Sequence, residues 1–453
     1  MNNFLSRINK TILKIPNKSL LLIGILMELS FLSFTIFQEG KGIELYMIVY
    51  AISFLLFLCG FYIIKLLVRS GKNDAGDIKV PIPVSRTALI IIAAGIIFRI
   101  TLIPANPSTS DDVYRYIWEG KILSSGYNPF EYPPDDERLN HLHSAELPSK
   151  VTFPSMTTIY PAIAQYTFAA AYSMTGENGA GLKIIYLIAE LVTFIFIIKI
   201  LRIKKLNTAY VLLYAWLPLP IMEYFINSHI DVIGIAFFTV FIFYVLKNNY
   251  LIAAIPFSLA VLTKILPLFF LPLLFKKFRL IKLFVFTLAA FIICTLIMYP
   301  LVPAEKSVNE SLFTYLSTWS FNGSLYSLLS MAFSDSSVVR SILLIVFMVF
   351  VGNIALRYDD FLKAVYGVWI CYIVFAATLY PWYLGWISAV NPFYSFSSVM
   401  SLLFTVNLTN FSPLGNVWKE FWWVLVIQYV PFYLFLIKDF YNPLSDWLKS
   451  KWH

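Results

Sequence analysis

Charged residues are scarce in this sequence. Only 13% of its 453 residues are Asp, Glu, Lys or Arg, whereas 59% are hydrophobic, and the mean hydropathy is +0.75. A water-soluble surface needs far more charge, so this composition excludes a soluble globular enzyme. The apolar residues come in runs of roughly 17–25, the length with which a helix crosses the hydrocarbon core of a bilayer. We therefore expect one all-α polytopic integral membrane protein, surrounded by membrane lipids.

Other features are also rare or missing. The three cysteines all lie in apolar runs, so we expect small core residues rather than a disulfide framework or a metal site. No polar stretch is long enough to form a nucleotide-binding domain, and the absence of a convincing internal repeat argues against an inverted-repeat transporter. The formal net charge of +9 comes from short basic clusters at the ends of apolar runs. Such clusters orient helices in a membrane, so we expect no nucleic-acid partner.

The basic clusters predict a topology. Arg7, Lys10, Lys14 and Lys18 precede the first apolar run with no acid among them. That run, Leu20 to Phe37, lacks a small-residue cleavage site after it, so we interpret it as a retained anchor with a cytoplasmic N-terminus.

Two further runs, Ile43 to Val68 and Ala88 to Ile103, place the segment from Pro104 to Thr158 outside. The later basic clusters all face the cytoplasm only if the run Ile159 to Met174 does not cross, so we expect that run to lie in the membrane interface. The resulting estimate is roughly 12–14 transmembrane helices, with the C-terminus also in the cytoplasm.

The external segment is the chemical centre of the sequence, because it holds eight of the 25 acidic residues. The adjacent carboxylates of Asp111 and Asp112 repel each other, so at least one should have a perturbed pKa or a cationic partner if the pair is partly buried. Such a pair suits general-base catalysis. The alternative is a helix cap, in which Ser110 or Asp111 accepts from the first backbone N–H groups.

A helix from Asp112 onward would place Arg115 and Glu119 on the same face, with Tyr116 and Trp118 beside them. A carboxylate, a guanidinium and aromatic rings together suit sugar-phosphate chemistry.

Two basic residues interrupt apolar runs. Arg99 lies near the outer end of its run, and Lys264 lies just before Pro267, where two short segments break on the outer side. Cations inside a membrane are costly unless they face water or an anion. Both are therefore candidates to bind a lipid-linked phosphate at headgroup level, and snorkelling to the interface is the alternative.

His229 and Asp231 lie two residues apart in a predicted external turn. Their side chains suit a sugar, a phosphate or a metal ion, but a metal site needs further ligands that the sequence does not group nearby. We favour contact with a sugar or phosphate, with helix capping as the alternative.

Two aromatic clusters stand next to polar groups farther along the chain. Trp319 and Asn322 form one, and Trp382 and Tyr383 form the other. Interfacial aromatic belts explain most such residues, and a sugar-binding platform is the alternative.

Five stretches combine in one order: SDDVYRYIWEG…GYNPF from Ser110, TIYPAIAQY from Thr158, NSHIDVIG from Asn227, LTKILPL from Leu262 and WSFNGSLY from Trp319. Together they resemble the GT-C glycosyltransferases, in particular the bacterial polyprenyl-phosphate-mannose-dependent mannosyltransferases, from about residue 90 to about residue 390. The sequence departs from that pattern twice. The hairpin from Leu20 to Val68 precedes the usual first helix, and Glu119 stands where the family more often has aspartate.

The resemblance implies a GT-C fold whose large first external loop contains interfacial helices. It divides the chain into an N-terminal hairpin with a basic cytoplasmic loop (1–87), a catalytic core with external loop 104–158 (88–300), and a C-terminal transmembrane region with external loop 301–337 (301–453). The implied activity is inverting transfer of a hexose, most often mannose, from a polyprenyl-phosphate donor to a glycan or lipid acceptor. The active site would face outward from the bacterial inner membrane.

The resemblance also implies roles for individual residues. Asp111 or Asp112 is the expected base, and Lys264, Arg99 and Arg115 are expected at the donor phosphate. The expected sugar or acceptor contacts are Glu119, Tyr116, Trp118, Asn128, His229, Asp231, Trp319, Asn322, Trp382 and Tyr383. The leaving phosphate is already activated, so we expect no metal and no other cofactor, and we expect a monomer.

Two other functions remain open from the sequence. An enzyme of the same class could move a whole lipid-linked oligosaccharide as a ligase or polymerase, which requires a long open groove instead of a narrow sugar pocket. A transporter or flippase for lipid-linked sugars would use the acids as a proton relay, but relay acids are expected at mid-membrane depth. The densest acids here lie in the external loop.

Overall fold

The computed structural model describes residues 15–40, 42–70, 84–303, 310–414 and 418–451. Helices dominate these ranges, and no β-strand forms within them apart from isolated bridges of Thr378 to Phe321 and Asn322. The predicted all-α polytopic class is confirmed. Arg7, Lys10 and Lys14, on which the predicted position of the N-terminus rests, lie outside the described residues.

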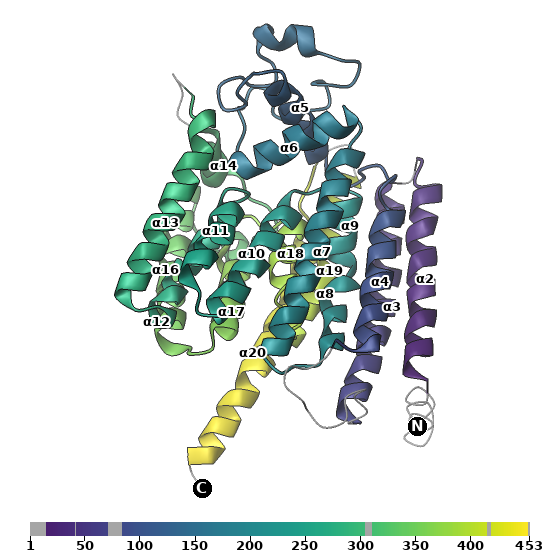
Figure 1. Ribbon diagram of the computed structural model, residues 1–453, viewed down its shortest axis with the longest axis vertical. Coiled ribbons are helices and arrows are strands. Elements are labelled where there is room, and N and C mark those ends of the chain that lie inside the picture. The colour runs from purple at the N-terminus through teal and green to yellow at the C-terminus, as the bar shows by residue number, and fades with distance from the viewer. Residues whose placement is uncertain (1–14, 41, 71–83, 304–309, 415–417, 452–453) are drawn as a thin grey trace.

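Six of the described helices are long and apolar enough to cross a membrane. They are α2 (Pro16–Phe37), α3 (Gly42–Arg69), α7 (Ala180–Ile203), α13 (Leu280–Met298), α16 (Ser336–Arg357) and α20 (Trp422–Lys451). Shorter helices pack among them: α4 (Arg86–Thr101), α10 (Asp231–Leu246), α11 (Tyr250–Val261) and α17 (Phe361–Phe375). Figure 1 shows these helices as one bundle with roughly aligned axes. The expected 12–14 crossings stay a prediction.

Prolines divide several apolar runs into short pieces, because proline lacks a backbone N–H and clashes with the preceding turn. The run around Pro218 and Pro220 becomes η2 (Thr208–Val211), α8 (Leu212–Ala215) and α9 (Pro218–Phe225). Pro267 and Pro272 lie in η3 (Leu266–Leu273), which leads into α12 (Leu274–Lys277). The other short elements are η4 (Tyr299–Leu301), α14 (Glu310–Thr318), α15 (Ser324–Leu329), η5 (Pro381–Tyr383), α18 (Leu384–Ser388), α19 (Ser397–Thr405) and η6 (Val406–Leu414).

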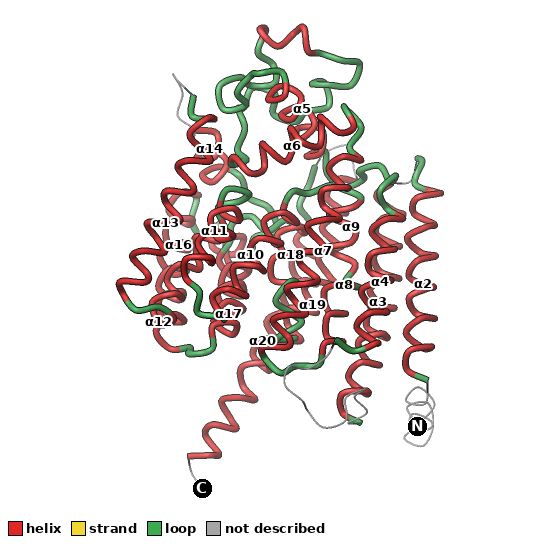
Figure 2. The backbone as a smooth tube through the Cα atoms, viewed as in Figure 1, coloured by secondary structure: helices red, strands yellow, loops and turns green. Residues whose placement is uncertain are grey.

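The segment between α4 and α6 (Ala162–Thr175), which the sequence predicts to be external, forms a cap over one end of the bundle. It contains α5 (Asp112–Ser124) and η1 (Glu137–Leu142). Figures 1 and 2 show α5 and α6 together at this end, with α6 running across the ends of the long helices. This is the arrangement predicted for the run 159–174. Gly120 permits the close packing of α5 on α6, because a Cβ there would collide with the Phe168 carbonyl oxygen.

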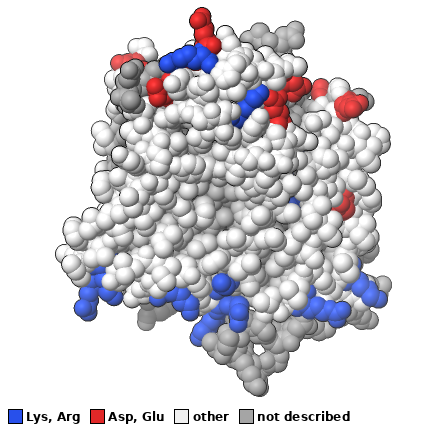
Figure 3. All heavy atoms as spheres, turned by 45° about the horizontal axis from the view of Figure 1, so that its top comes forward, with Lys and Arg blue, Asp and Glu red and all other residues white. Residues whose placement is uncertain are grey.

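The charged side chains separate between the two ends of the molecule. In Figure 3, Lys and Arg gather along the end opposite the cap, while most visible Asp and Glu lie at or near the cap. Helix α2 begins and α20 ends at the basic end (Figure 1). The arrangement agrees with the expected bias of basic residues toward the cytoplasm.

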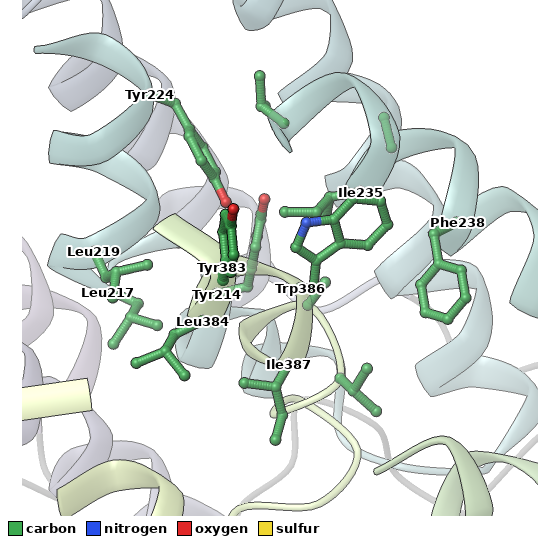
Figure 4. Packing of buried hydrophobic residues seen from close by; sticks show 14 of the residues in the cluster. Tyr214, Leu217, Leu219, Tyr224, Ile235, Phe238, Tyr383, Leu384, Trp386 and Ile387 are labelled. Carbon is green, nitrogen blue, oxygen red and sulfur yellow. The ribbon is translucent and has the colours of Figure 1, made fainter. Parts of the chain in front are cut away.

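A tightly packed core joins α9, α10 and α18 below the cap (Figure 4). Trp386 is fully buried there, and its indole Nε1 donates to Asp231 Oδ1 at 2.7 Å. Gly385 leaves room for the Tyr224 hydroxyl, since a Cβ at this position would overlap it. This packing fixes the start of α10, which carries Asp231, beneath the cap.

Candidate active site

A cavity of about 1360 Å³ lies between the cap and the bundle. Its polar wall comes from the start of α5, the segment before α6 and the break between α11 and η3. Its apolar wall comes from η3, α16 and α17, with the side chains of Phe269, Leu343, Leu344, Phe347 and Phe375. The cavity therefore has one face that suits a sugar phosphate and another that suits a hydrocarbon chain.

The acidic pair opens onto this cavity where α5 begins. Asp111 occupies the N-cap position, but its side chain makes no capping hydrogen bond, and the Ser110 hydroxyl instead accepts from the Asp112 amide at 3.3 Å. Capping therefore does not occupy the Asp111 carboxylate. Partial burial and the neighbouring charge of Asp112 raise the pKa of Asp111, although Lys150 opposes the shift.

Asp112 is surrounded by groups that can stabilise or move a proton. Its Oδ2 lies 3.4 Å from the Tyr116 hydroxyl, 3.5 Å from the Tyr160 hydroxyl and 3.8 Å from His229 Nδ1. The side chain is 31% exposed. One side of the carboxylate therefore faces the cavity, and the other side contacts the two tyrosines and His229.

Lys264 reaches the same cavity from the break after α11. Its ammonium donates to both oxygens of Asp231, at 2.8 and 3.0 Å, and lies 3.8 Å from the centroid of the Tyr383 ring. An ammonium has three N–H donors, so one remains for a ligand. Asp231 is buried as the counter-ion of Lys264 and does not line the cavity.

Arg115 and Glu119 share one face of α5, as predicted, and their side chains meet at 3.3 Å. Besides Glu119, the Arg115 guanidinium donates to the carbonyls of Thr152, Phe153 and Met156 at 2.7–3.2 Å. These bonds use four of the five N–H donors of a guanidinium. Although it touches the cavity, Arg115 mainly fixes the loop that forms the cavity wall.

Glu119 lies behind this wall instead of facing the cavity. It accepts from Thr158 Oγ1 at 2.8 Å and from Gln165 Nε2 at 2.7 Å, and so joins α5 to α6. Burial raises the pKa of Glu119, while Arg115, Gln165 and Thr158 act in the opposite direction. The sugar contact expected for Glu119 is replaced by a structural role.

The structure does not bring Arg99 to the cavity. Its guanidinium is fully buried and pairs with Glu190 at 2.7 Å, and it also donates to the carbonyls of Gly95 and Ala215 at 2.9 Å. A partner on α7 thus compensates the buried charge. The sequence could not place Glu190 next to Arg99, and this ion pair keeps Arg99 away from the cavity where a donor phosphate was expected.

His229 lies beneath the cavity floor. It is fully buried, and its ring stacks on Trp382 with the centroids 3.7 Å apart. Trp382 and Tyr383 line the cavity, as does Trp319 on the other side. His229 is therefore separated from a bound sugar by Trp382 but remains next to Asp112.

Of the other residues predicted to contact the sugar or acceptor, one lines the cavity and three do not. Tyr116 lines the cavity, whereas Trp118, Asn128 and Asn322 do not. Trp118 packs against His143, with ring centroids 5.7 Å apart. Asn128 donates to the Leu301 carbonyl at 3.0 Å, and Asn322 donates to Leu379 and Gln428 at 3.3 and 3.2 Å. These three positions support the walls.

Sequence reasoning missed several residues at the site. Tyr160 and Tyr380 line the cavity; Tyr160 lies inside the stretch TIYPAIAQY, and Tyr380 lies two residues before Trp382. Tyr315 lines it as well, and its hydroxyl lies 2.7 Å from that of Tyr383. Glu223 is a buried acid facing His229. A single acid in an apolar run, as at Glu223, is the signal that could have found it.

No group of three or more His, Cys, Asp or Glu side chains able to hold a metal ion is found in the part of the chain that the structure describes. The metal-independent reaction stays a prediction.

A family model described as "Alpha-(1->6)-mannopyranosyltransferase, N-terminal domain" matches residues 22–277. The match covers more than half of the chain and includes the acidic pair, His229 and Lys264. It also includes nearly all of the hairpin formed by α2 and α3, so the hairpin belongs to the matched region and does not merely precede it. No curated protein matches the chain.

Proposed function

Because this chain belongs to the α-(1→6)-mannopyranosyltransferase family, we propose that it transfers mannose from a polyprenyl-phosphate donor to a hydroxyl group of a glycan or lipid acceptor. The reaction takes place on the outer side of a bacterial cytoplasmic membrane and inverts the anomeric configuration. One observation carries the proposal: Asp112 and Lys264 face a single cavity that also has an apolar wall, formed by η3, α16 and α17.

The apolar wall supports a lipid-linked donor. Leu343, Leu344 and Phe347 lie on α16, one of the helices long enough to cross a membrane, and 54% of Leu344 is exposed. The cavity thus reaches the lipid-facing surface, where the first isoprene units can enter from the bilayer. Its volume of about 1360 Å³ exceeds that of an ordinary small-molecule site, roughly 300–1,000 Å³, as a donor and an acceptor bound together require.

Lys264 supports the placement of the phosphate. Its ammonium lies at the junction between the polar and apolar walls, with one N–H free of Asp231. A preorganised cation at this position stabilises the negative charge that develops on the leaving phosphate. Asp231 keeps the ammonium in place when no donor is bound, since it compensates the charge.

Asp112 supports the chemistry at the acceptor. It takes the proton from the acceptor hydroxyl, whose oxygen forms a bond to the anomeric carbon while the bond from that carbon to the phosphate oxygen breaks. The electron pair of the broken bond leaves with the phosphate. Attack opposite the leaving group in a single step gives inversion.

The proposal is tested with purified protein in detergent or lipid nanodiscs. Short-chain polyprenyl-phosphate mannose labelled in the sugar should yield labelled glycan, whereas GDP-mannose should yield none. NMR of the product should show the configuration opposite to that of the donor, and EDTA should leave the rate unchanged. Transfer from GDP-mannose alone, or a retained configuration, would remove the proposed donor or mechanism.

A further inference from the structure

A buried carboxylate lies on the far side of His229 from Asp112. His229 Nδ1 is 3.8 Å from Asp112 Oδ2, and His229 Nε2 is 3.3 Å from Glu223 Oε2. His229 is 0% exposed and Glu223 is 1% exposed. Neither ring nitrogen forms a hydrogen bond of good geometry among the described residues, so the two carboxylates are close charged neighbours of the ring, with Glu223 the nearer. The imidazole therefore stands between two carboxylates, one open to the cavity and one closed to it.

Glu223 is itself held by two further side chains. The Tyr46 hydroxyl on α3 donates to Glu223 Oε1 at 2.7 Å, and Asn227 Nδ2 donates to Oε2 at 3.1 Å. Asn227 also accepts from the backbone amides of Ser108 and Thr109, just before the acidic pair. The N-terminal hairpin is thus connected through Glu223 to the loop that carries Asp112.

This arrangement selects one form of the imidazole. A carboxylate only accepts hydrogen bonds, and Glu223 at 3.3 Å is closer to the ring than Asp112 at 3.8 Å, so the nearer carboxylate favours the tautomer with the proton on Nε2. The lone pair of Nδ1 then points toward Asp112. A group that fixes the tautomer of a histidine in this way has a large effect on proton transfer, even though it does not touch the substrate.

We propose that Glu223 is a positioning residue for glycosyl transfer: it holds His229 with Nδ1 unprotonated toward Asp112, so that the proton taken from the acceptor leaves Asp112 through His229. The inference rests on the proposed function. As the acceptor O–H bond breaks, its proton moves to Asp112 and then to Nδ1. The resulting imidazolium lies between two carboxylates, and after the product leaves it returns the proton through Asp112, which is open to the cavity, to water.

Other titratable groups also face this network, and the pH dependence must be measured against them. Around Asp112 they are Asp111, Tyr116, Tyr160, Lys264, Tyr315 and Tyr380. Around Glu223 they are Tyr46, Tyr50 and Tyr224. Substituting Glu223 leaves the groups around Asp112 in place but removes a charge beside Tyr46, Tyr50 and Tyr224, so the pH profile is interpreted together with a direct measurement of the histidine tautomer.

The first test replaces Glu223 with Gln. The amide can donate to Nε2, which moves the histidine proton to Nδ1 and makes Asp112 a weaker base. The expected result for Glu223→Gln is a kcat lower by roughly 100-fold, an unchanged KM for the donor and a shift of the acidic limb of the pH–rate profile to lower pH. An unchanged profile with normal kcat would overturn the inference.

A matched pair of tyrosine variants guards against simple loss of stability. Tyr46 and Tyr214 are both fully buried, and each donates to a buried glutamate at 2.7 Å, Tyr46 to Glu223 and Tyr214 to Glu190. Tyr46→Phe should lower kcat several-fold without changing KM, whereas Tyr214→Phe should leave kcat unchanged. Equal losses in both variants would show a structural effect only and contradict the inference.

A spectroscopic test needs no substrate. The chain has four histidines, so ¹⁵N-histidine spectra are simple, and His229→Gln identifies the His229 signals. The wild type should show His229 protonated at Nε2, and Glu223→Gln should show it protonated at Nδ1. The same tautomer in both proteins would overturn the inference even if transfer is confirmed, whereas a failed transfer assay with the expected tautomers would count only against the proposed function.

Discussion

At the scale of single residues, the two neighbouring acids have different surroundings. Asp112 meets two tyrosine hydroxyls and His229 on its inner side. Asp111 is exposed at the surface and interacts with the charge of Lys150 on the loop. The side chain of Asp112 is therefore the better oriented of the two for proton transfer, while Asp111 contributes mainly charge.

The raised pKa of Asp111 predicts an effect on stability. A folded-state pKa above the usual 3.8 means that the folded protein binds this proton more tightly than the unfolded chain does. Ionisation at higher pH then disfavours the fold. Asp111→Asn should therefore have a higher Tm than the wild type at pH 7, and the difference should vanish below about pH 4. Thermal unfolding at both pH values checks this, and a lower Tm at pH 7 would show that the charge stabilises the fold.

The sequence showed which kinds of residue form the site more reliably than it showed where each residue lies in the fold. Asp112 and Lys264 line the cavity as expected, because an acidic pair and a lone cation in an apolar run are costly unless they are used. Arg99 gave the same signal, yet it pairs with Glu190 on another helix. The sequence alone does not show which distant acid a buried cation will meet, so the two outcomes could not be separated.

At the scale of elements, the crossing of α5 and α6 positions the acids. The backbones approach closely at Gly120, and Glu119 next to it bonds to Gln165 on α6. The sequence predicted both helices, and the expectation that the second does not cross the membrane stays a prediction. The sequence did not show their contact, because the pairing of distant helices depends on backbone shape at residues such as Gly120.

Gly120→Ala should separate α5 from α6, since the new Cβ would overlap the Phe168 carbonyl oxygen. We expect a loss of about 1–3 kcal/mol in stability, typical of overpacking, together with reduced transfer. Gly352→Ala on α16 is the matched control, because no atom lies within 4 Å of its added Cβ. Unfolding and transfer assays on both variants check this, and a Gly120→Ala protein with wild-type behaviour would contradict the predicted role of the crossing.

The sequence identified the apolar runs, but it did not show how each run is divided into helices. The stretch 208–226 is one largely apolar run in the sequence, but in the structure Pro218 and Pro220 help to divide it into three short elements. A proline marks a probable break without fixing how the chain continues after it. The break here brings Glu223 and His229 below the acidic pair, a placement that only the folded chain reveals.

At the scale of the whole molecule, most of the visible basic side chains and the candidate active site lie at opposite ends (Figure 3). The cap carries the acidic pair, and the other end carries most visible basic side chains (Figure 3). From the usual bias of basic residues toward the cytoplasm we predict that the cavity opens outside. Under this prediction, a donor reaches it through the bilayer or from the outer leaflet.

Cysteine labelling in intact cells tests this orientation. The three native cysteines are free, so they are first replaced. Arg138→Cys, on the exposed part of the cap, should react with a membrane-impermeant maleimide, whereas Lys247→Cys at the opposite end of α10 should react only after the cells are opened. The reverse pattern would place the cavity in the cytoplasm.

The most direct measurement of the central claim compares the rates of mannose transfer by wild type, Asp112→Asn and Asp111→Asn, with the fold of each variant verified. We predict that Asp112→Asn loses roughly 10²–10⁴-fold in kcat, as expected when a general base is removed, and that Asp111→Asn stays within about tenfold of the wild type because this charge acts only indirectly. Full activity of Asp112→Asn would contradict the account, and so would a pattern in which Asp111→Asn alone is inactive.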